Sequence, residues 1–218
     1  MNYLIFDAET VGTPETMDAP STDTDNWPRV VQLAWTVVAD DVGVSTDVYS
    51  FIVRPEGFPI PDEAARIHGI TTAQAKKEGY SINQVLGGFY GALRGAHGLV
   101  AHNADFDAPT VGAEFVRALG ADPLEPLPTT CTMKETTEYC GLVRPGGRGY
   151  KWPTLQELHW ELFGHGFESA HDAGADVAAC ASCFRELMRR EIIFPAPSPS
   201  TSPTPKSVAD LHLREPDW

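Results

Sequence analysis

Asp7 and Glu9 directly follow a run of apolar residues. Side chains of a β-strand alternate between its two faces, so both carboxylates would project from one side, while Leu4, Phe6 and Ala8 face a core on the other. Two acids this close repel each other, and a divalent cation commonly holds such a pair. An isolated Asp-x-Glu is more often a solvated strand end, because acidic side chains are mostly exposed. The pair therefore predicts a metal site only if the chain supplies further ligands.

Two further polar clusters could supply them. The segment His102 to Asp107 lies where a short apolar strand is expected to pass into a helix, and ligands of α/β sheets bind at such strand ends. The segment His171 to Asp176 opens the last long helix. A separation of five residues is about 500° of helical rotation, so His171 and Asp176 converge only if His171 lies in the loop before the helix. A His in that loop suits a base working beside a metal ligand.

The elements that would position these clusters follow from the hydrophobic pattern. Strands over 3–10, 29–38 and 47–53, with a turn at Asp40 to Gly43, indicate an initial antiparallel meander. Helical and strand patterns then alternate, which favours one α/β domain with a mixed sheet. The expected helices are 61–67, 81–93, 106–119, 134–139, 154–163 and 173–190, and the expected short strands are 98–103 and 128–133.

Composition sets further limits. The chain has 218 residues, 42% of them hydrophobic, which is enough for one domain with a substantial core. A net charge of −14 argues against coating nucleic acid through diffuse positive charge, but it does not exclude an enzyme that meets phosphates through bound cations. No apolar run approaches the roughly 20 residues of a membrane span, and the N-terminus lacks the features of a secretory signal. We therefore expect a cytoplasmic protein without membrane partners.

The four cysteines allow two interpretations. Cys180 and Cys183 have C-x-x-C spacing, but they fall in an Ala-rich helical pattern in which both would share one face. Structural zinc ligands usually come as two tight pairs, whereas Cys131 and Cys140 are far apart. Reduced packing residues of a helix are favoured over a zinc or redox site.

The chain changes character near its C-terminal end. A Pro-, Ser- and Thr-rich tract cannot build a core and is typical of an extended linker. We expect a domain over residues 1–193, a linker over 194–207 and a short tail over 208–218.

Five segments occur in a specific order: Asp7-Ala8-Glu9-Thr10, Ile67-His68-Gly69-Ile70-Thr71, Asn103-x-x-Phe106-Asp107, Trp152-Pro153-x-Leu155-x-x-Leu158 and His171-x-x-x-x-Asp176. Together they resemble the DEDDh exonucleases, a family that includes the proofreading subunit of bacterial replicative DNA polymerase. The resemblance covers about residues 1–190. It implies an RNase H-like fold, in which helices flank a five-stranded mixed sheet.

The resemblance also implies a site. Asp7, Glu9, Asp107 and Asp176 would be the acidic metal ligands and His171 the general base. Two divalent ions, Mg²⁺ or Mn²⁺, would lie about 4 Å apart and hold the scissile phosphate, one activating water and one stabilising the leaving 3′-oxygen. Imidazole gains and loses a proton near neutral pH, which suits the task of His171.

The same resemblance implies that Thr10, His68, Asn103 and Phe106 contact the substrate. His102 could also do so, but a His at a strand end is more often hydrogen-bonded structure. Asp105 is expected to be a surface acid or a helix cap. A loop with Arg144, Arg148 and Lys151 could reach phosphates, although a charged, Gly-rich loop is more often merely solvated.

Two positions depart from the family pattern. Val11 stands where Thr is frequent, and Gly174 stands where a bulky apolar residue is common. We expect Gly174 to loosen the start of the last helix and to alter how His171 is held. Neither position is a metal ligand.

The expected function is a metal-dependent 3′→5′ exonuclease that releases nucleoside 5′-monophosphates from single-stranded DNA with a free 3′ end. A separate polymerase or repair protein is a further possible partner. An exoribonuclease of the same family is the nearest alternative, because selection for the 2′-OH is invisible in the sequence. A non-catalytic module would be expected to lack an acid or the His, and a Ca²⁺ site would favour a contiguous acidic loop.

Overall fold

The computed structural model describes residues 1–39 and 47–195. The predicted turn at Asp40 to Gly43 and the predicted tail over 208–218 lie outside the described residues. So does the predicted linker, apart from Phe194 and Pro195, which have no regular structure. None of the helices in the described ranges combines the length and the hydropathy that crossing a bilayer requires.

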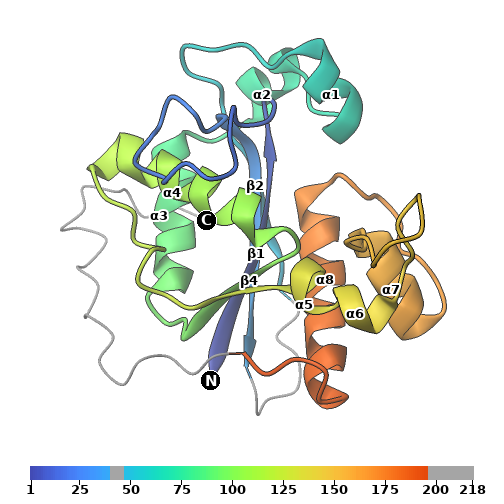
Figure 1. Cartoon of the computed structure of the whole chain (residues 1–218). Coiled ribbons are helices and arrows are strands. Elements are labelled where there is room, and N and C mark those ends of the chain that lie inside the picture. The colour runs from blue at the N-terminus through green and yellow to red at the C-terminus, as the bar shows by residue number, and fades with distance from the viewer. Residues whose placement is uncertain (40–46, 196–218) are drawn as a thin grey trace.

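A five-stranded mixed sheet forms the centre of the molecule, in the order β3-β2-β1-β4-β5 (Figure 1). The strands β1 (Asn2–Thr10), β2 (Val30–Ala39) and β3 (Tyr49–Ile52) pair antiparallel. The strands β4 (Gly98–Ala101) and β5 (Thr129–Cys131) join the other edge in parallel to β1. The predicted antiparallel meander and mixed sheet are confirmed.

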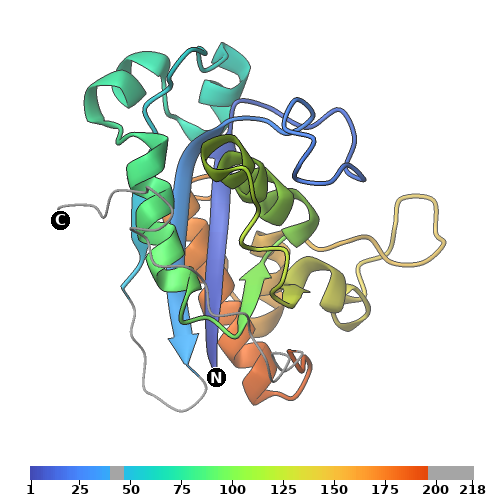
Figure 2. The same ribbon diagram turned by 90° about the vertical axis from the view of Figure 1, so that its left-hand side faces the viewer.

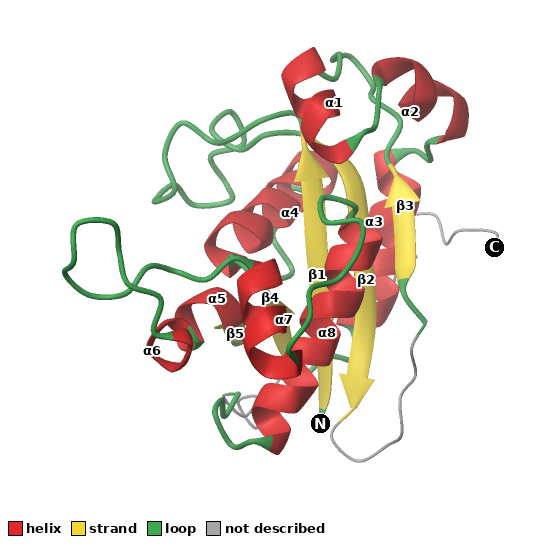
Figure 3. Ribbon diagram, turned by 90° about the vertical axis from the view of Figure 1, so that its right-hand side faces the viewer, coloured by secondary structure: helices red, strands yellow, loops and turns green. Residues whose placement is uncertain are grey.

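Helices cover both faces of this sheet. The helices α3 (Ile82–Leu93) and α4 (Ala104–Leu119) lie on the face seen in Figure 2. The helices α7 (Leu155–Phe163) and α8 (Ala173–Arg189) lie on the opposite face, as Figure 3 shows. The sheet is therefore the middle layer of three, and β1 is buried on both sides.

The two faces of β1 belong to different hydrophobic clusters. Leu4, Phe6 and Ala8 pack against α3 and α4, as the alternation predicts. Tyr3 and Ile5, on the other face, pack against α7 and α8. The carboxylates at positions 7 and 9 continue this second face. They consequently emerge beside the beginning of α8, where the apolar packing ends.

Local sequence signals explain where most helices begin and end. The helix α1 (Asp62–His68) ends at Gly69, whose φ of 79° is the left-handed conformation that glycine adopts easily. Thr154 starts α7 through a capping box with Glu157. The helix α2 (Thr72–Glu78), capped by Thr71, was not predicted, because it has a single buried residue, Ala75, and hence no apolar stripe.

Other boundaries differ by a few residues from the expected ones. The helix α4 begins at Ala104 rather than at 106, since Asn103 takes the left-handed conformation and turns the chain directly from β4 into the helix. The segment expected as one helix over 134–139 is two single turns, α5 (Thr132–Glu135) and α6 (Thr137–Cys140). Cys180 and Cys183 are buried between α8 and the sheet, so their interpretation as packing residues is confirmed.

The long connection between β1 and β2 is anchored to α4. Arg29 pairs with the buried Glu114 at 2.8 Å, and Arg117 donates a hydrogen bond to the carbonyl oxygen of Trp27 at 2.7 Å. Glu114 is buried, with only 1% of its surface exposed. Its charge is nevertheless compensated, because its carboxylate also accepts a hydrogen bond from the backbone N–H of Val30. These contacts fix the beginning of β2 relative to α4.

Candidate active site

The end of β1 positions the first two acids. Asp7 lies opposite Ala34, and Glu9 lies opposite Gln32 of β2. The pairing shifts register between Glu9 and Thr10 and ends with Thr10 opposite Val30, so an irregularity directly follows Glu9. Both carboxylates lie on the face covered by α8, as the alternation of the strand requires.

The third acid comes from the first turn of α4. Asp107 is 3% exposed, and its Oδ1 accepts a hydrogen bond of 3.3 Å from the backbone N–H of Ala8. Ala8 is the residue between the two acids of β1. This contact, across 99 positions of sequence, therefore places the carboxylate of Asp107 beside Asp7.

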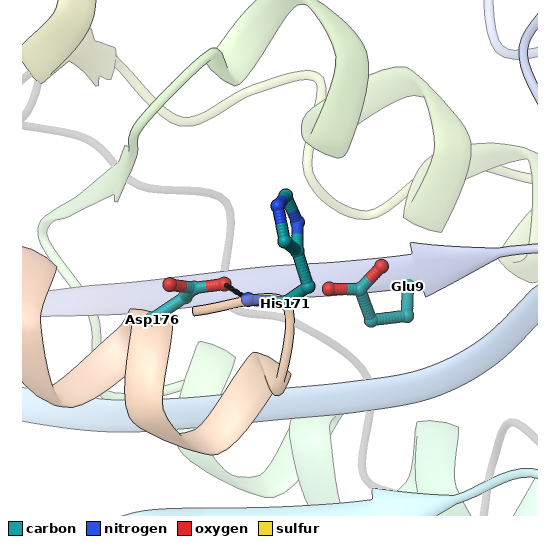
Figure 4. A group of neighbouring side chains, drawn as sticks. All are labelled: Glu9, His171 and Asp176. Carbon is teal, nitrogen blue, oxygen red and sulfur yellow. Dashed lines mark hydrogen bonds between the residues drawn. The ribbon is translucent and has the colours of Figure 1, made fainter. Parts of the chain in front are cut away.

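The fourth acid and the histidine come from the start of α8. His171 lies in the loop before the helix, as predicted, with a left-handed φ of 69°. Its backbone N–H donates to Oδ2 of Asp176 at 2.9 Å (Figure 4). Glu9, His171 and Asp176 each present a possible ligand atom within 4.8 Å of one another. The structure thus brings together all five residues that the family resemblance assigned to the site.

Burial and mutual repulsion both oppose ionisation in this cluster, and burial is the larger cause. Burial raises the pKa of Asp7 well above its usual value, and the negative charges of Asp107, Asp176, Glu9 and Asp172 raise it further. The pKa of Glu9 rises to about 7, first through burial and then through Asp176 and Asp172. Each carboxylate therefore resists ionisation in the company of the others.

Asp107 and Asp176 show the same conflict with some compensation. Burial raises the pKa of Asp107, and the N–H of Ala8 opposes part of this rise. Burial likewise raises the pKa of Asp176, and the N–H of His171 opposes it. The backbone thus compensates these charges only in part.

The donor set fits hard divalent cations. Asp7, Glu9, Asp107 and Asp176 offer only carboxylate oxygens, which Mg²⁺ and Mn²⁺ prefer. A cation among them would reverse the repulsion that raises the pKa values of Asp7 and Glu9. The residues present therefore suit the metal centre expected from the family.

Two of the predicted substrate contacts lie at the end of β1. Thr10 is 8% exposed and donates its hydroxyl hydrogen bond to the carbonyl of Gly12 at 2.6 Å. His68, at the end of α1, accepts from the backbone N–H of Ile70 through Nδ1. Burial lowers the pKa of His68 and the backbone of Thr10 opposes this, so the ring lies beside Thr10. Thr10 directly follows Glu9 in β1 and His68 lies beside Thr10, and the contact of both residues with substrate remains a prediction.

The other two predicted contacts surround the start of α4. Asn103 precedes the helix in a left-handed conformation, and its side chain makes no capping hydrogen bond. Phe106 is partly buried one residue before Asp107. Asp105 forms an exposed ion pair with Lys134, which confirms that it is a surface acid. Its carboxylate is thus engaged away from the acidic cluster.

His102 has the structural role that its position favours. Its Nε2 lies 3.0 Å from the carbonyl oxygen of Pro153, and its Nδ1 lies 3.0 Å from the hydroxyl of Thr132. Since a carbonyl only accepts, Nε2 carries the proton and Nδ1 accepts from Thr132. Burial lowers the pKa of His102 to about 4. The neutral ring joins the end of β4 to the segment that precedes α7.

The structure gives Gly174 a packing role. The helix α8 begins at Ala173, as predicted, and Asp172 caps it by accepting from the N–H of Ala175. A Cβ on Gly174 would lie 3.1 Å from Cβ of Ser50 on β3. Glycine therefore permits close packing of α8 on the sheet, whereas the expected loosening of the helix start stays a prediction.

Two residues near the site escaped the sequence analysis. Gln32 and Asp172 are joined by a hydrogen bond of 3.1 Å between β2 and the start of α8. Asp172 also contributes to the negative potential at Asp7 and Glu9. One signal was available, since Gln32 is the only strongly polar residue in the otherwise apolar run of β2.

Comparison with known proteins defines the class. The sequence profile of the Exonuclease family, RNase_T, matches residues 4–184. The chain therefore belongs to the exonuclease family, and the family predicted from the ordered motifs is confirmed. It is 27% identical over 198 residues to 3′-5′ exonuclease DinG of Bacillus subtilis (strain 168), a match that covers 90% of this chain but only 18% of DinG.

Solved structures confirm the RNase H-like fold. E. coli exonuclease I in complex with a dT13 oligonucleotide superimposes with a TM-score of 0.67 at 20% identity, covering 87% of this chain and 41% of that one. The zinc-bound form of the E. coli exonuclease I complex with single-stranded DNA gives a TM-score of 0.63 at 22% identity, with the same coverage. This chain thus spans less than half of the length of these proteins.

Proposed function

We propose that the protein is a metal-dependent 3′→5′ exonuclease that hydrolyses single-stranded DNA from its 3′ end and releases nucleoside 5′-monophosphates. The observation that carries the proposal is the convergence of four carboxylates and His171 at the end of β1. Membership of the exonuclease family and the likeness to an enzyme solved with DNA oligonucleotides support it.

The acidic side chains would bind the metal ions, and His171 would transfer the proton. Asp7, Glu9, Asp107 and Asp176 would hold two divalent ions, which when bound polarise the scissile phosphate and lower the pKa of water. His171 would take the proton from the attacking water. It is exposed, and a ring nitrogen lies within 4.8 Å of carboxylate oxygens of Glu9 and Asp176. The hydrogen bond to Asp176 comes from the backbone N–H and uses neither ring nitrogen.

The segment that precedes α7 supplies a suitable surface for the rest of the strand. Arg144 and Arg148 lie there without an acidic residue between them, in a chain of net charge −14, and Lys151 lies there in an ion pair with Glu157. Trp152 is 55% exposed and Tyr150 is 37% exposed. Cations beside exposed aromatic rings suit a single strand, because phosphates meet the cations and bases stack on the rings.

The test compares 3′-end degradation of a single-stranded DNA and of the matching RNA, each labelled at the 5′ end, with Mg²⁺ or Mn²⁺. We expect a ladder that shortens from the 3′ end of DNA and ends as 5′-monophosphates. The variant Asp7→Ala should abolish it, whereas Asp105→Ala, which removes an acid that faces Lys134 instead, should not. Rapid loss of RNA with intact DNA would assign an exoribonuclease. Activity that survives Asp7→Ala would refute the catalytic site.

A further inference from the structure

Gln32 occupies an unusual position in the sheet. It lies within the apolar strand β2, is 5% exposed and sits directly opposite Glu9 of β1. Burying an amide is costly unless its polar atoms find partners, so the contacts of this side chain indicate why it is there.

Both polar atoms of the Gln32 amide form hydrogen bonds to residues at the start of α8, and the nitrogen also bonds to Ser50 of β3. Nε2 donates to Oδ2 of Asp172 at 3.1 Å and to the hydroxyl of Ser50 at 3.0 Å. Oε1 accepts from the backbone N–H of Ala173 at 3.2 Å. The N–H of Ala173 is one of the first N–H groups of a helix, which have no partner within the helix.

Asp172 extends this contact along the first turn. While its Oδ2 receives the Gln32 amide, its Oδ1 accepts from the N–H of Ala175 at 3.0 Å. Its backbone carbonyl accepts from the N–H of Asp176 at 2.9 Å. Asp172 thus links Gln32 directly to the turn that carries Asp176, and His171 is its neighbour in the chain. The close approach of Gly174 to Ser50 keeps this turn against the sheet.

We infer that Gln32 is a positioning residue for the catalytic centre, an inference that rests on the proposed exonuclease function. Its amide clamps the first turn of α8 to the strand that pairs with Glu9. The clamp sets the position of Asp176 and His171 relative to Glu9. With the Asp172 carboxylate as its partner, position 32 needs an amide, because the same side chain donates to that carboxylate and accepts from a backbone N–H.

An exchange of the two side-chain chemistries tests the clamp. In Gln32→Glu, two carboxylates face each other where one hydrogen bond stood. In Asp172→Asn, the NH₂ group of Gln32 faces a second NH₂ group in place of the carboxylate oxygen that accepted its hydrogen bond. In the double variant Gln32→Glu/Asp172→Asn, the carboxylate now at position 32 would accept from the amide now at position 172 and from the N–H of Ala173. The bonds between β2 and the first turn of α8 are then restored with the same total charge. Asn83→Asp, at an exposed position of α3, controls for the added charge.

We expect each single variant to lower kcat about 10-fold to 100-fold with little change in KM, since a misplaced catalytic group costs about this much. We also expect faster amide hydrogen exchange over residues 173–176. The double variant should recover both quantities to within about 3-fold, and Asn83→Asp should resemble the parent.

A purely structural role predicts lower melting temperatures but an unchanged kcat below them. That result, or a double variant no better than Gln32→Glu, would overturn the inference. Hydrogen exchange of the first turn of α8, measured with and without Mn²⁺, does not depend on nuclease activity. A parent protein without activity but with exchange that responds as expected would therefore refute the proposed function and leave the clamp intact.

Discussion

Replacing Glu9 by Gln should stabilise the metal-free protein at the same time as it disables the metal centre. The carboxylate of Glu9 is partly buried, and its pKa is raised from 4.5 to about 7, first by burial and then by Asp176 and Asp172. A side chain of the same shape without charge removes both the cost of burying the charge and the repulsion. The substitution therefore separates the stability of the fold from the needs of the site.

The magnitude follows from the pKa difference. A carboxyl group whose pKa is higher in the folded protein has no effect on stability below the unfolded pKa of about 4.5. Its cost grows as the pH rises from 4.5 to about 7 and is complete above 7. The full difference corresponds to about 3 kcal/mol, and partial exposure reduces the expected gain at pH 8 to about 2 kcal/mol.

Urea unfolding at pH 5 and pH 8, in EDTA, measures this gain. Glu9→Gln should raise the free energy of unfolding more at pH 8 than at pH 5. Glu63→Gln, on the exposed face of α1, should leave the free energy of unfolding unchanged at both pH values. Mn²⁺ should raise the stability of the parent protein more than that of the variant, because a ligand that binds only the folded state stabilises it by mass action. A variant that is no more stable than the parent at pH 8, or that gains as much from Mn²⁺, would refute the account of the cluster.

Three further predictions concern other parts of the molecule. His171→Asn should lower kcat by about 10²-fold to 10⁴-fold, as expected for loss of a general base, while stabilisation by Mn²⁺ persists. If the variant lost both kcat and the stabilisation by Mn²⁺, His171 would be a metal ligand instead. The double variant Arg144→Gln/Arg148→Gln should raise KM for single-stranded DNA and flatten its salt dependence with kcat retained, and an unchanged salt slope would mean that the loop is only solvated. His102→Leu should cost about 1–3 kcal/mol at pH 7, because it leaves the carbonyl of Pro153 and the hydroxyl of Thr132 without their partner. Since the pKa of His102 is lowered from 6.5 to about 4, the parent loses stability as the pH falls through this interval, and the variant should lose less.

Much of the fold follows from local sequence. Alternation along β1 shows which side chains face α3 and α4 and which face α8, because the period of a strand is fixed by its backbone. Left-handed glycines at 69, 120 and 164 mark the ends of α1, α4 and α7. The helix α2 was missed because tertiary packing of Ala75, rather than an amphipathic pattern, stabilises it.

The candidate site divides in the same way. The identity of its acids and of His171 came from ordered motifs, and the loop position of His171 came from helical geometry. The contact between Asp107 and Ala8 and the clamp of Gln32 on Asp172 join residues 99 and 140 positions apart. The raised pKa of Glu9 and the need for glycine at position 174 likewise depend on neighbours from other elements. Sequence thus determined which chemical groups are available, whereas only the tertiary structure decided their distances, since hydrogen bonding and charge repulsion act between atoms that lie close in space wherever they stand in the chain.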